Sequence, residues 1–511
     1  MSVAQTVHAL IERQAASQPE ALYALAADRA DSICYGQLAR DCRSVWALLQ
    51  QRGVRAGDTV SLVMPNGLNT LRVLLGAMWG GACVNPVNLL AQPEQMSYVL
   101  DHADSKLVVV APDWAERVRT MAAGLARPMV VLEADPNGLA LPGENRDVDA
   151  QPLAAAAPEP SPDSPALLMY TSGTTGQPKG VMLSQANLAA NALSIAAEHL
   201  LTPKDRVLAV LPLYHINAFA VTMLAPLASG GSLVMAPRFS AARFWGQALR
   251  QQCSWLNVVP TIVSFLLEAQ ADAPPREALS HMRFLRSASA ALPPEHLQAF
   301  EQRFGIGVIE TMGLTETVAP AFSNPLDRAL RKLGSVGRAS GCEAQVIDAA
   351  LQPVADGDTG EVALRGPNVM LGYYKNEVAT QASFTPDGWL RTGDLGHRDA
   401  DGFFFITGRI KELIIKGGEN IAPREIDEVL LRHPMVLEAA AVGLPDKHYG
   451  QEILACVVLR PGVAEDEAET ALRGFCELHL GRYKSPKLIR FLTELPRGPS
   501  GKVQRLKLLD L

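Results

Sequence analysis

Hydroxyl side chains, glycines and one lysine are concentrated between Thr171 and Lys179, where the sequence is T-S-G-T-T-G-Q-P-K. Glycines let backbone N–H groups come close to a ligand, and Ser and Thr add short donors that reach phosphate oxygens. The apolar run 166–170 before this segment predicts a buried strand, and Ser184 after it is a suitable N-cap for a helix over 185–200. A flexible linker has a similar composition, but a linker would not be confined between a strand and a helix. The segment therefore predicts a phosphate-binding loop in a strand–loop–helix unit.

This loop differs from that of common ATPases, in which Gly and Lys are adjacent and precede Ser or Thr. Here Pro178 precedes Lys179 and Gly180 follows it. The string instead resembles the signature of the adenylate-forming superfamily, which comprises acyl-CoA synthetases, carrier-protein-loading adenylation domains and luciferases. Further blocks in the family's order extend this resemblance over essentially the whole chain.

Two of these blocks suit a nucleotide. In R-T-G-D, which ends at Asp394, a carboxylate after a turn glycine can accept hydrogen bonds from both ribose hydroxyls, although T-G-D is also a frequent turn. The resemblance assigns Asp394 to the ribose, with Arg409 beside it. In E-T-M-G-L-T-E (310–316), Met312 stands where relatives usually have an aromatic ring that stacks on adenine. Its polarizable thioether can take that place. Glu316 matches the family's magnesium-associated acid, and Thr175 would add a hydroxyl near the same ion.

Two further blocks suit a moving domain. In G-R-I-K-E-L-I-I-K-G-G-E-N (408–420), the resemblance makes Lys411 the hinge and brings the 416–419 turn into the thioester-forming site. In P-S-G-K, Lys502 matches the family's catalytic lysine. Its ammonium group would bridge the substrate carboxylate and the α-phosphate of ATP as negative charge builds up between them.

The resemblance thus implies three catalytic side chains, Lys502, Glu316 and Thr175. The expected nucleotide and CoA contacts are Thr171, Ser172, Gly173, Thr174, Thr175, Gly176, Lys179, Ala290, Glu310, Thr311, Met312, Thr315, Asp394, Arg409, Lys416, Gly417 and Gly418.

The implied activity is that of an AMP-forming acid–CoA ligase, which uses ATP, Mg²⁺ and CoA. Three alternatives stay open: an enzyme that loads a carrier protein, a luciferase-like oxidase and a non-catalytic nucleotide-binding relative. The sequence shows no carrier segment with an attachment serine, which favours free CoA. The retention of Lys502, Glu316 and Asp394 speaks against a non-catalytic relative.

The acid pocket is expected to be polar. Several stretches resemble oxalate–CoA ligases, among them R-S-A-S-A (286–290) and S-N-P-L (323–326). Those enzymes carry a histidine where this chain has Ala319. The loss of that donor weakens the oxalate assignment, and alanine would leave room for a longer or less polar acid. Polar groups favour a short acid with a second polar or anionic group, oxalate-like in size, over a medium- or long-chain fatty acid. The expected lining residues are His215, Asn217, Ser287, Ser289, Gly313 and Ala319.

Two side chains of this region have alternative interpretations. His215 either contacts the distal end of the acid or is a packed histidine that gates the pocket. Arg286 is either an anion anchor or a structural salt-bridge partner at the end of a strand.

The elements that must position these groups alternate between helix and strand, which predicts an α/β fold. We expect a large N-terminal domain, residues 1–410, with two helix-flanked, mainly parallel sheets and a small β-rich subdomain from 334 to 372. A smaller, mobile α+β domain, residues 411–511, would carry Lys502.

Composition narrows the cellular setting. A net charge of −7 without a basic stripe gives no reason to expect nucleic-acid binding. The seven cysteines lack a C-x-x-C pair and suggest reduced thiols. We find no signal-peptide pattern and no apolar run of about 20 residues. We therefore expect a cytoplasmic enzyme, not inserted in a membrane, whose partners are small molecules; a homodimer is left open.

Overall fold

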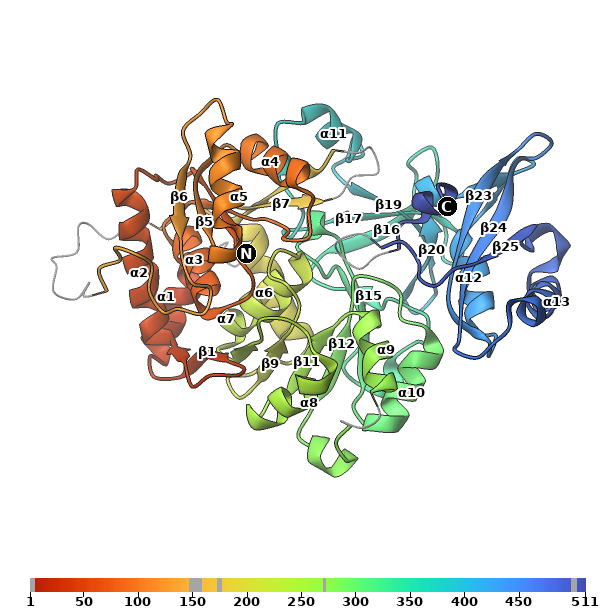
Figure 1. The fold of residues 1–511 in the computed structure, drawn as a ribbon, viewed down its shortest axis with the longest axis horizontal. Helices are drawn as coiled ribbons and strands as arrows, with labels where there is room; N and C mark the ends of the chain where they lie inside the picture. Colours follow the sequence, from red (N-terminus) through yellow and green to blue (C-terminus); the bar gives the residue numbers. More distant parts are fainter. Residues whose placement is uncertain (1–4, 147–158, 172–176, 270–272, 498–502) are drawn as a thin grey trace.

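The computed structural model describes residues 5–146, 159–171, 177–269, 273–497 and 503–511. Within them the strands form four sheets of nine, four, seven and five strands (Figure 1). Helices flank the two largest sheets, so the α/β class with a large N-terminal and a smaller C-terminal part is confirmed. No helix in the described ranges is long and apolar enough to cross a membrane.

The seven-stranded sheet carries the strand before the predicted phosphate-binding loop. Its central strands run parallel, and β8 and β18 pair antiparallel at one edge. Its strands, in sheet order, are β18 (Gly372–Tyr373), β8 (Lys179–Ser184), β7 (Pro165–Thr171), β4 (Cys83–Pro86), β3 (Thr59–Val63), β5 (Ser105–Val110) and β6 (Val130–Glu133). The helices α3 (Leu68–Trp79), α4 (Pro93–His102) and α5 (Pro112–Ala123) contact this sheet, and α1 (Val7–Ser17) and α2 (Tyr35–Gln51) pack against α3.

The nine-stranded sheet carries the predicted adenine and acid segments. It is parallel from β13 to β1, with antiparallel strands at both edges. Its strands, in sheet order, are β15 (Arg338–Ala339), β14 (Phe322–Ser323), β13 (Val308–Met312), β12 (Phe284–Ser287), β11 (Trp255–Val258), β9 (Arg206–Ala209), β10 (Ser232–Met235), β1 (Leu22–Ala26) and β2 (Ser32–Cys34). Its helices are α7 (Ala225–Ser229), α8 (Ala241–Arg250), α9 (Pro260–Glu268) and α10 (Pro294–Phe304).

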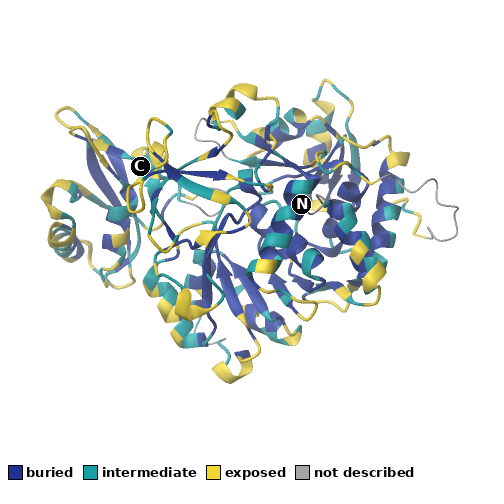
Figure 2. Ribbon diagram, turned by 180° about the vertical axis from the view of Figure 1, so that it is seen from behind, coloured by how far each residue is buried: buried dark blue, intermediate teal, exposed yellow. Residues whose placement is uncertain are grey.

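Two helices connect these sheets. α6 (Gln185–Glu198) contacts β7 and β8 of one sheet, and the π-helix η1 (Asn217–Leu224) contacts β9 and β11 of the other. α6 and η1 also contact each other. η1 and β11 are wholly buried and α6 is buried along one face, whereas the exposed residues follow the outer helices and loops (Figure 2).

The β-rich part is a four-stranded antiparallel sheet that extends beyond the expected 334–372 range. Its strands are β16 (Glu343–Ile347), β17 (Gly360–Arg365), β19 (Leu390–Arg398) and β20 (Phe404–Arg409). The short helix α11 (Glu377–Ala382) precedes β19. β19 pairs with β17 across a long connection and β20 pairs with β19, and the local sequence pattern does not reveal this pairing.

The C-terminal sheet lies at one end of the molecule (Figure 1). Its residues form hydrophobic clusters of their own, centred on Ile414, Ile453 and Leu472 in one and Leu454 and Leu495 in the other. The elements are β21 (Ile414–Lys416), β22 (Glu419–Ile421), α12 (Pro423–Leu431), β23 (Val436–Asp446), β24 (Gly450–Leu459), α13 (Glu465–Lys484), β25 (Leu488–Phe491) and η6 (Arg505–Leu509).

One local expectation is wrong. The segment after the phosphate-binding loop is the strand β8, antiparallel to β7, so the order is strand–loop–strand–helix. Val181 and Leu183, two positions apart, are buried, whereas Met182 between them is half-buried, which suits a strand. The predicted cap is confirmed: Ser184 Oγ accepts a hydrogen bond from Asn187 N–H, and Asn187 Oδ1 accepts one from Ser184 N–H.

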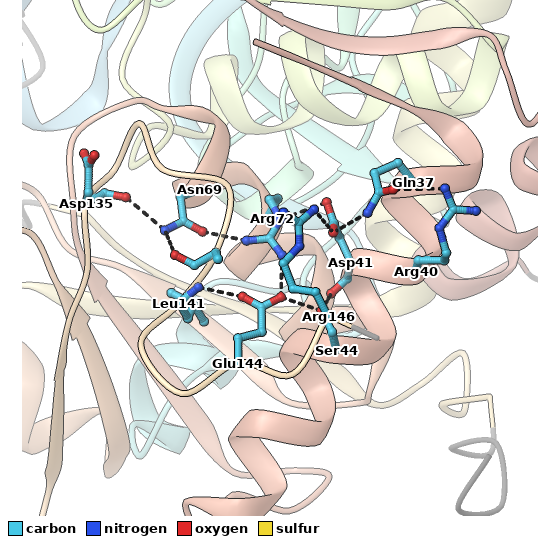
Figure 3. Close-up of polar contacts among 11 residues, drawn as sticks. Gln37, Arg40, Asp41, Ser44, Asn69, Arg72, Asp135, Leu141, Glu144 and Arg146 are labelled. Carbon is cyan, nitrogen blue, oxygen red and sulfur yellow. Dashed lines mark hydrogen bonds and ion pairs between the residues drawn. The ribbon is translucent and has the colours of Figure 1, made fainter. Parts of the chain in front are cut away.

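A buried ion-pair network attaches the segment that contains Glu144 to the helices α2 and α3. Arg72 of α3 is 0% exposed and lies between two carboxylates (Figure 3). Its Nε lies 2.8 Å from Asp41 of α2, and its Nη2 lies 2.5 Å from Glu144. Two carboxylates around one guanidinium offset the cost of burying that charge.

Candidate active site

The predicted phosphate-binding loop begins at the end of β7 and ends at the start of β8. Its residues Ser172, Gly173, Thr174, Thr175 and Gly176 lie outside the described residues, as does Lys502. Thr171 and Lys179, which flank the loop, are described and pair with each other in the β7–β8 ladder.

Tyr373 connects Lys179 with Glu316 at this edge. Lys179 Nζ lies 4.9 Å from the centre of the Tyr373 ring, and the Tyr373 hydroxyl donates to Glu316 Oε1 at 2.8 Å. Burial, with the charge of Glu316 adding to it, raises the pKa of Tyr373, so the phenol keeps its proton. Sequence reasoning missed Tyr373, because its role depends on the pairing of β18 with β8.

Glu316 suits a magnesium ion that is bound mainly through its nucleotide. Glu316 lies on the 3₁₀ turn η3 (Thr315–Thr317). In the described part of the chain no group of three or more His, Cys, Asp and Glu side chains could hold a metal. Mg²⁺ at Glu316 would therefore take most ligands from ATP phosphates and water, as this ion commonly does.

Asp394 and Arg409 lie together, as the resemblance implies. They face each other in the β19–β20 ladder, and Arg409 Nε lies 2.6 Å from Asp394 Oδ1. The carboxylate is nearly buried, with 7% of the side chain exposed, whereas Arg409 is 45% exposed. The guanidinium thus orients the carboxylate that is expected to meet the ribose. Arg409 directly precedes the short helix η5 (Ile410–Glu412), which contains the expected hinge Lys411.

The expected adenine segment lies on β13 and the turn after it. Glu310 is buried and its Oε1 accepts a hydrogen bond from Leu292 N–H at 3.2 Å. Thr311 is buried, and Met312 is half-buried at the end of the strand. A Cβ on Gly313 would lie 2.8 Å from the backbone of Ala319, so a glycine is needed for the close approach of these two segments.

Burial gives Glu310 an unusual titration, because it raises the pKa of this carboxyl from 4.5 to about 7. We expect Glu310→Gln to stabilise the protein at pH 8 and to lose this advantage as the pH falls to 5. The unfolded glutamate ionises near pH 4.5 and the folded one near pH 7. As the pH rises from 4.5 to above 7, the free energy of unfolding of the wild type therefore falls by about 3 kcal/mol. Glutamine retains an oxygen for Leu292 N–H and does not ionise.

Urea unfolding from pH 5 to pH 8 tests this expectation. Glu277→Gln is a suitable control, because Glu277 is exposed. A stability difference between Glu310→Gln and the wild type that does not change with pH would contradict the assigned titration.

On the acid side, the structure connects Asn217 and Ser289. Asn217 is buried at the start of η1, and its Nδ2 donates to Ser289 Oγ at 3.3 Å. Ser289 has φ 76, a left-handed conformation that is uncommon for residues other than glycine and is concentrated at functional sites. Ser287 is buried on β12 beside them.

The remaining expected residues are placed as follows. Ala319 is 7% exposed beside Gly313, and Ala290 is exposed at the turn after β12. His215 is half-buried, and its ring centre lies 4.8 Å from that of Tyr214. Its role as ligand or gate stays a prediction.

The turn 416–419 belongs to the C-terminal sheet. Lys416 Nζ lies 2.9 Å from Glu452 and donates to Tyr483 O at 2.9 Å, and Gly417 N–H donates to Tyr449 O. Gly417 and Gly418 both have positive φ, which the turn between β21 and β22 requires. In this arrangement the Lys416 ammonium group is bound by the strand β24 and the helix α13 of the C-terminal part.

Arg505, three positions after Lys502, is a second residue that sequence reasoning missed. Its guanidinium pairs with Asp427 of α12 and with Glu412 of η5, at 3.1 Å from the latter, and donates to Ala441 O. This arginine therefore fastens the chain end both to the C-terminal core and to the residue next to the expected hinge.

Comparisons with known proteins agree with this architecture. The model of the family described as AMP-binding enzyme matches residues 11–374, and that of the AMP-binding enzyme C-terminal domain matches residues 425–502. The chain belongs to the AMP-binding enzyme family. It is an acid–thiol ligase of the acyl-CoA synthetase type, with ATP and CoA as co-substrates.

Particular relatives cover nearly the whole chain. A sulfoacetate–CoA ligase of Cupriavidus necator is 57% identical over 99% of this chain and 98% of its own length. An oxalate–CoA ligase of Arabidopsis thaliana is 36% identical over 91% of this chain and 90% of its own. The ATP-bound crystal structure of MatB from Rhodopseudomonas palustris superposes with a TM-score of 0.90 at 31% identity, over 99% of this chain and 98% of that one.

Proposed function

We propose that this ligase activates a short acid with a second anionic group, and that sulfoacetate is its foremost candidate. The observation that carries the proposal is the hydrogen-bonded polar set Asn217, Ser289 and Arg286 where the acid is expected. A fatty-acid tunnel would be lined by apolar side chains instead. The names of the relatives from Cupriavidus and Arabidopsis support it, because both denote short acids with two anionic groups.

In the first step the substrate carboxylate attacks the α-phosphorus of ATP and pyrophosphate leaves. Two anions must be brought together, so positioning and electrostatic stabilisation dominate. Lys502 and the 171–176 loop supply positive charge and N–H donors, and Asp394, oriented by Arg409, holds the ribose. Glu316, oriented by Tyr373, would hold Mg²⁺ together with the ATP phosphates, and the ion would neutralise phosphate charge.

In the second step the CoA thiol attacks the acyl-adenylate carbonyl carbon and AMP leaves. Residues 411–511 would turn about Lys411, withdraw Lys502 and bring the turn with Lys416, Gly417 and Gly418 to the thiol. Such a motion separates two reactions that need different groups at one place. Lys416 would then exchange its contacts with Glu452 and Tyr483 for contacts near the adenylate.

The test of this function is pyrophosphate release across a panel of acids, with and without CoA. We expect kcat/KM for sulfoacetate to exceed that for octanoate by roughly 100-fold or more, because a polar pocket rejects a ligand that leaves its groups unpaired. Oxalate, malonate, acetate, hexanoate and a long-chain acid complete the panel. A preference for octanoate or longer acids would contradict the proposal and would mean that Ala319 opens an apolar tunnel. Adenylate formation without thioester formation from free CoA would indicate a carrier protein as acceptor.

A further inference from the structure

Arg286 is a buried cation whose charge no described residue neutralises. It lies on β12, its side chain is 0% exposed, and in the described ranges no carboxylate forms an ion pair with it. The other fully buried arginine, Arg72, is placed between Asp41 and Glu144 (Figure 3). The expected alternative, a structural salt bridge for Arg286, is therefore absent from the described part of the chain.

One end of the Arg286 guanidinium is fixed and the other is free. Nη1 donates to Asn217 Oδ1 at 2.7 Å and to Asn257 Oδ1 at 2.8 Å, which uses both of its hydrogens. Asn257 Nδ2 in turn donates to Asn217 Oδ1 at 3.3 Å, so the two amides hold each other. Nε and Nη2 are buried and find no hydrogen-bond partner among the described residues. These two atoms form the side of the guanidinium that binds two oxygens of one anion.

The electrostatic surroundings favour an anion at this edge. Burial lowers the pKa of Arg286 to about 9, so the group stays charged at neutral pH. Burial and then the charge of Arg286 lower the pKa of the nearby His199 to about 3, so that ring is neutral. An isolated buried charge is destabilising, and a well-oriented anion with two hydrogen bonds offsets that cost.

We propose that the Nε–Nη2 edge of Arg286 binds the distal anionic group of the acid substrate. This inference rests on the proposed function, which requires such a group. The location supports it: Asn217 joins Arg286 to Ser289, and β12 ends at the carboxyl edge of the parallel sheet, where ligands of open α/β sheets bind. Both a sulfonate and a carboxylate present two oxygens to this edge.

The test compares the wild type with Arg286→Gln, Arg286→Lys and Arg283→Met. Arg283 is a matched control, because it lies three residues earlier in the chain and already has a carboxylate partner, Asp205, at 2.7 Å. The Arg283 side chain is 31% exposed. The readout is the ratio of kcat/KM for sulfoacetate to kcat/KM for propionate in pyrophosphate release. Each ratio comes from one preparation, so the folded fraction cancels.

We expect the ratio to fall by roughly 100-fold or more in Arg286→Gln, because the distal anion loses its partner. The ratio for Arg286→Lys should lie between those of the wild type and Arg286→Gln, since lysine keeps the positive charge but cannot bind two oxygens side by side as arginine does. Arg283→Met should keep the wild-type ratio. Malonate in place of sulfoacetate shows whether the edge prefers sulfonate or carboxylate.

The outcomes separate the two proposals. A wild type that does not prefer sulfoacetate or malonate to propionate overturns the proposed function. A wild-type preference that persists in Arg286→Gln overturns the anchor alone. If the Arg286 variants do not fold, a crystal structure of the wild type with sulfoacetate and a non-hydrolysable ATP analogue shows whether the distal group binds to Arg286. Distal oxygens bound to Nε and Nη2 support the anchor, and a distal group bound elsewhere overturns it.

Discussion

Replacing Lys502 by alanine is expected to slow adenylate formation by roughly 100- to 1,000-fold, the usual cost of removing one group that stabilises transition-state charge. The substrate carboxylate and the α-phosphate are both anionic, and negative charge grows between them as the bond forms. Thioester formation from presynthesised acyl-adenylate has no such requirement and should be affected far less. Pyrophosphate release and single-turnover thioester formation measure the two half-reactions separately.

Lys507→Ala is the matched control for this experiment, because Lys507 is an exposed lysine of the same terminal segment. It should leave both half-reactions near wild-type rates. Equal losses in both half-reactions of Lys502→Ala would show that Lys502 has a structural role.

The fold could be predicted from the sequence wherever periodicity and caps mark an element. The helix expected over 185–200 begins after Ser184 as its capping pattern indicates, and the strand expected over 166–170 is β7 (Pro165–Thr171). β8 was missed because a run of only six residues also fits the lead-in to a helix, and only its pairing with β7 makes it a strand.

Those residues of the site that belong to a sequence motif could be predicted. Asp394 and Arg409 face each other as the resemblance implies, and Asn217 meets Ser289. The contacts that position such groups join distant parts of the chain: Tyr373 and Glu316 lie 57 positions apart. Asn217 and Arg286 lie 69 positions apart. Such pairs follow from the packing of strands and have no local signal in the sequence.

The hinge variant Lys411→Pro is expected to retain ATP-dependent adenylation and to lose CoA transfer by roughly 100-fold or more. Lys411 lies in η5, between Arg409 of the β-rich sheet and the C-terminal sheet that begins at Ile414. Proline fixes φ near −65°, and a backbone state that proline cannot adopt costs about 3 kcal/mol or more, which corresponds to about 100-fold in rate. If Lys411 changes its φ between the two steps, one of the two arrangements becomes inaccessible.

Lys411→Ala separates the backbone effect from the loss of the side chain. Alanine leaves φ free, so this variant should carry out both half-reactions, whereas the proline variant should accumulate acyl-adenylate. Rapid-quench measurement of acyl-adenylate and acyl-CoA in one turnover distinguishes the two. Normal overall turnover in Lys411→Pro would exclude Lys411 as the pivot. Equal loss of CoA transfer in both variants would assign the effect to the lysine side chain instead of the hinge, because only the proline variant restricts the backbone.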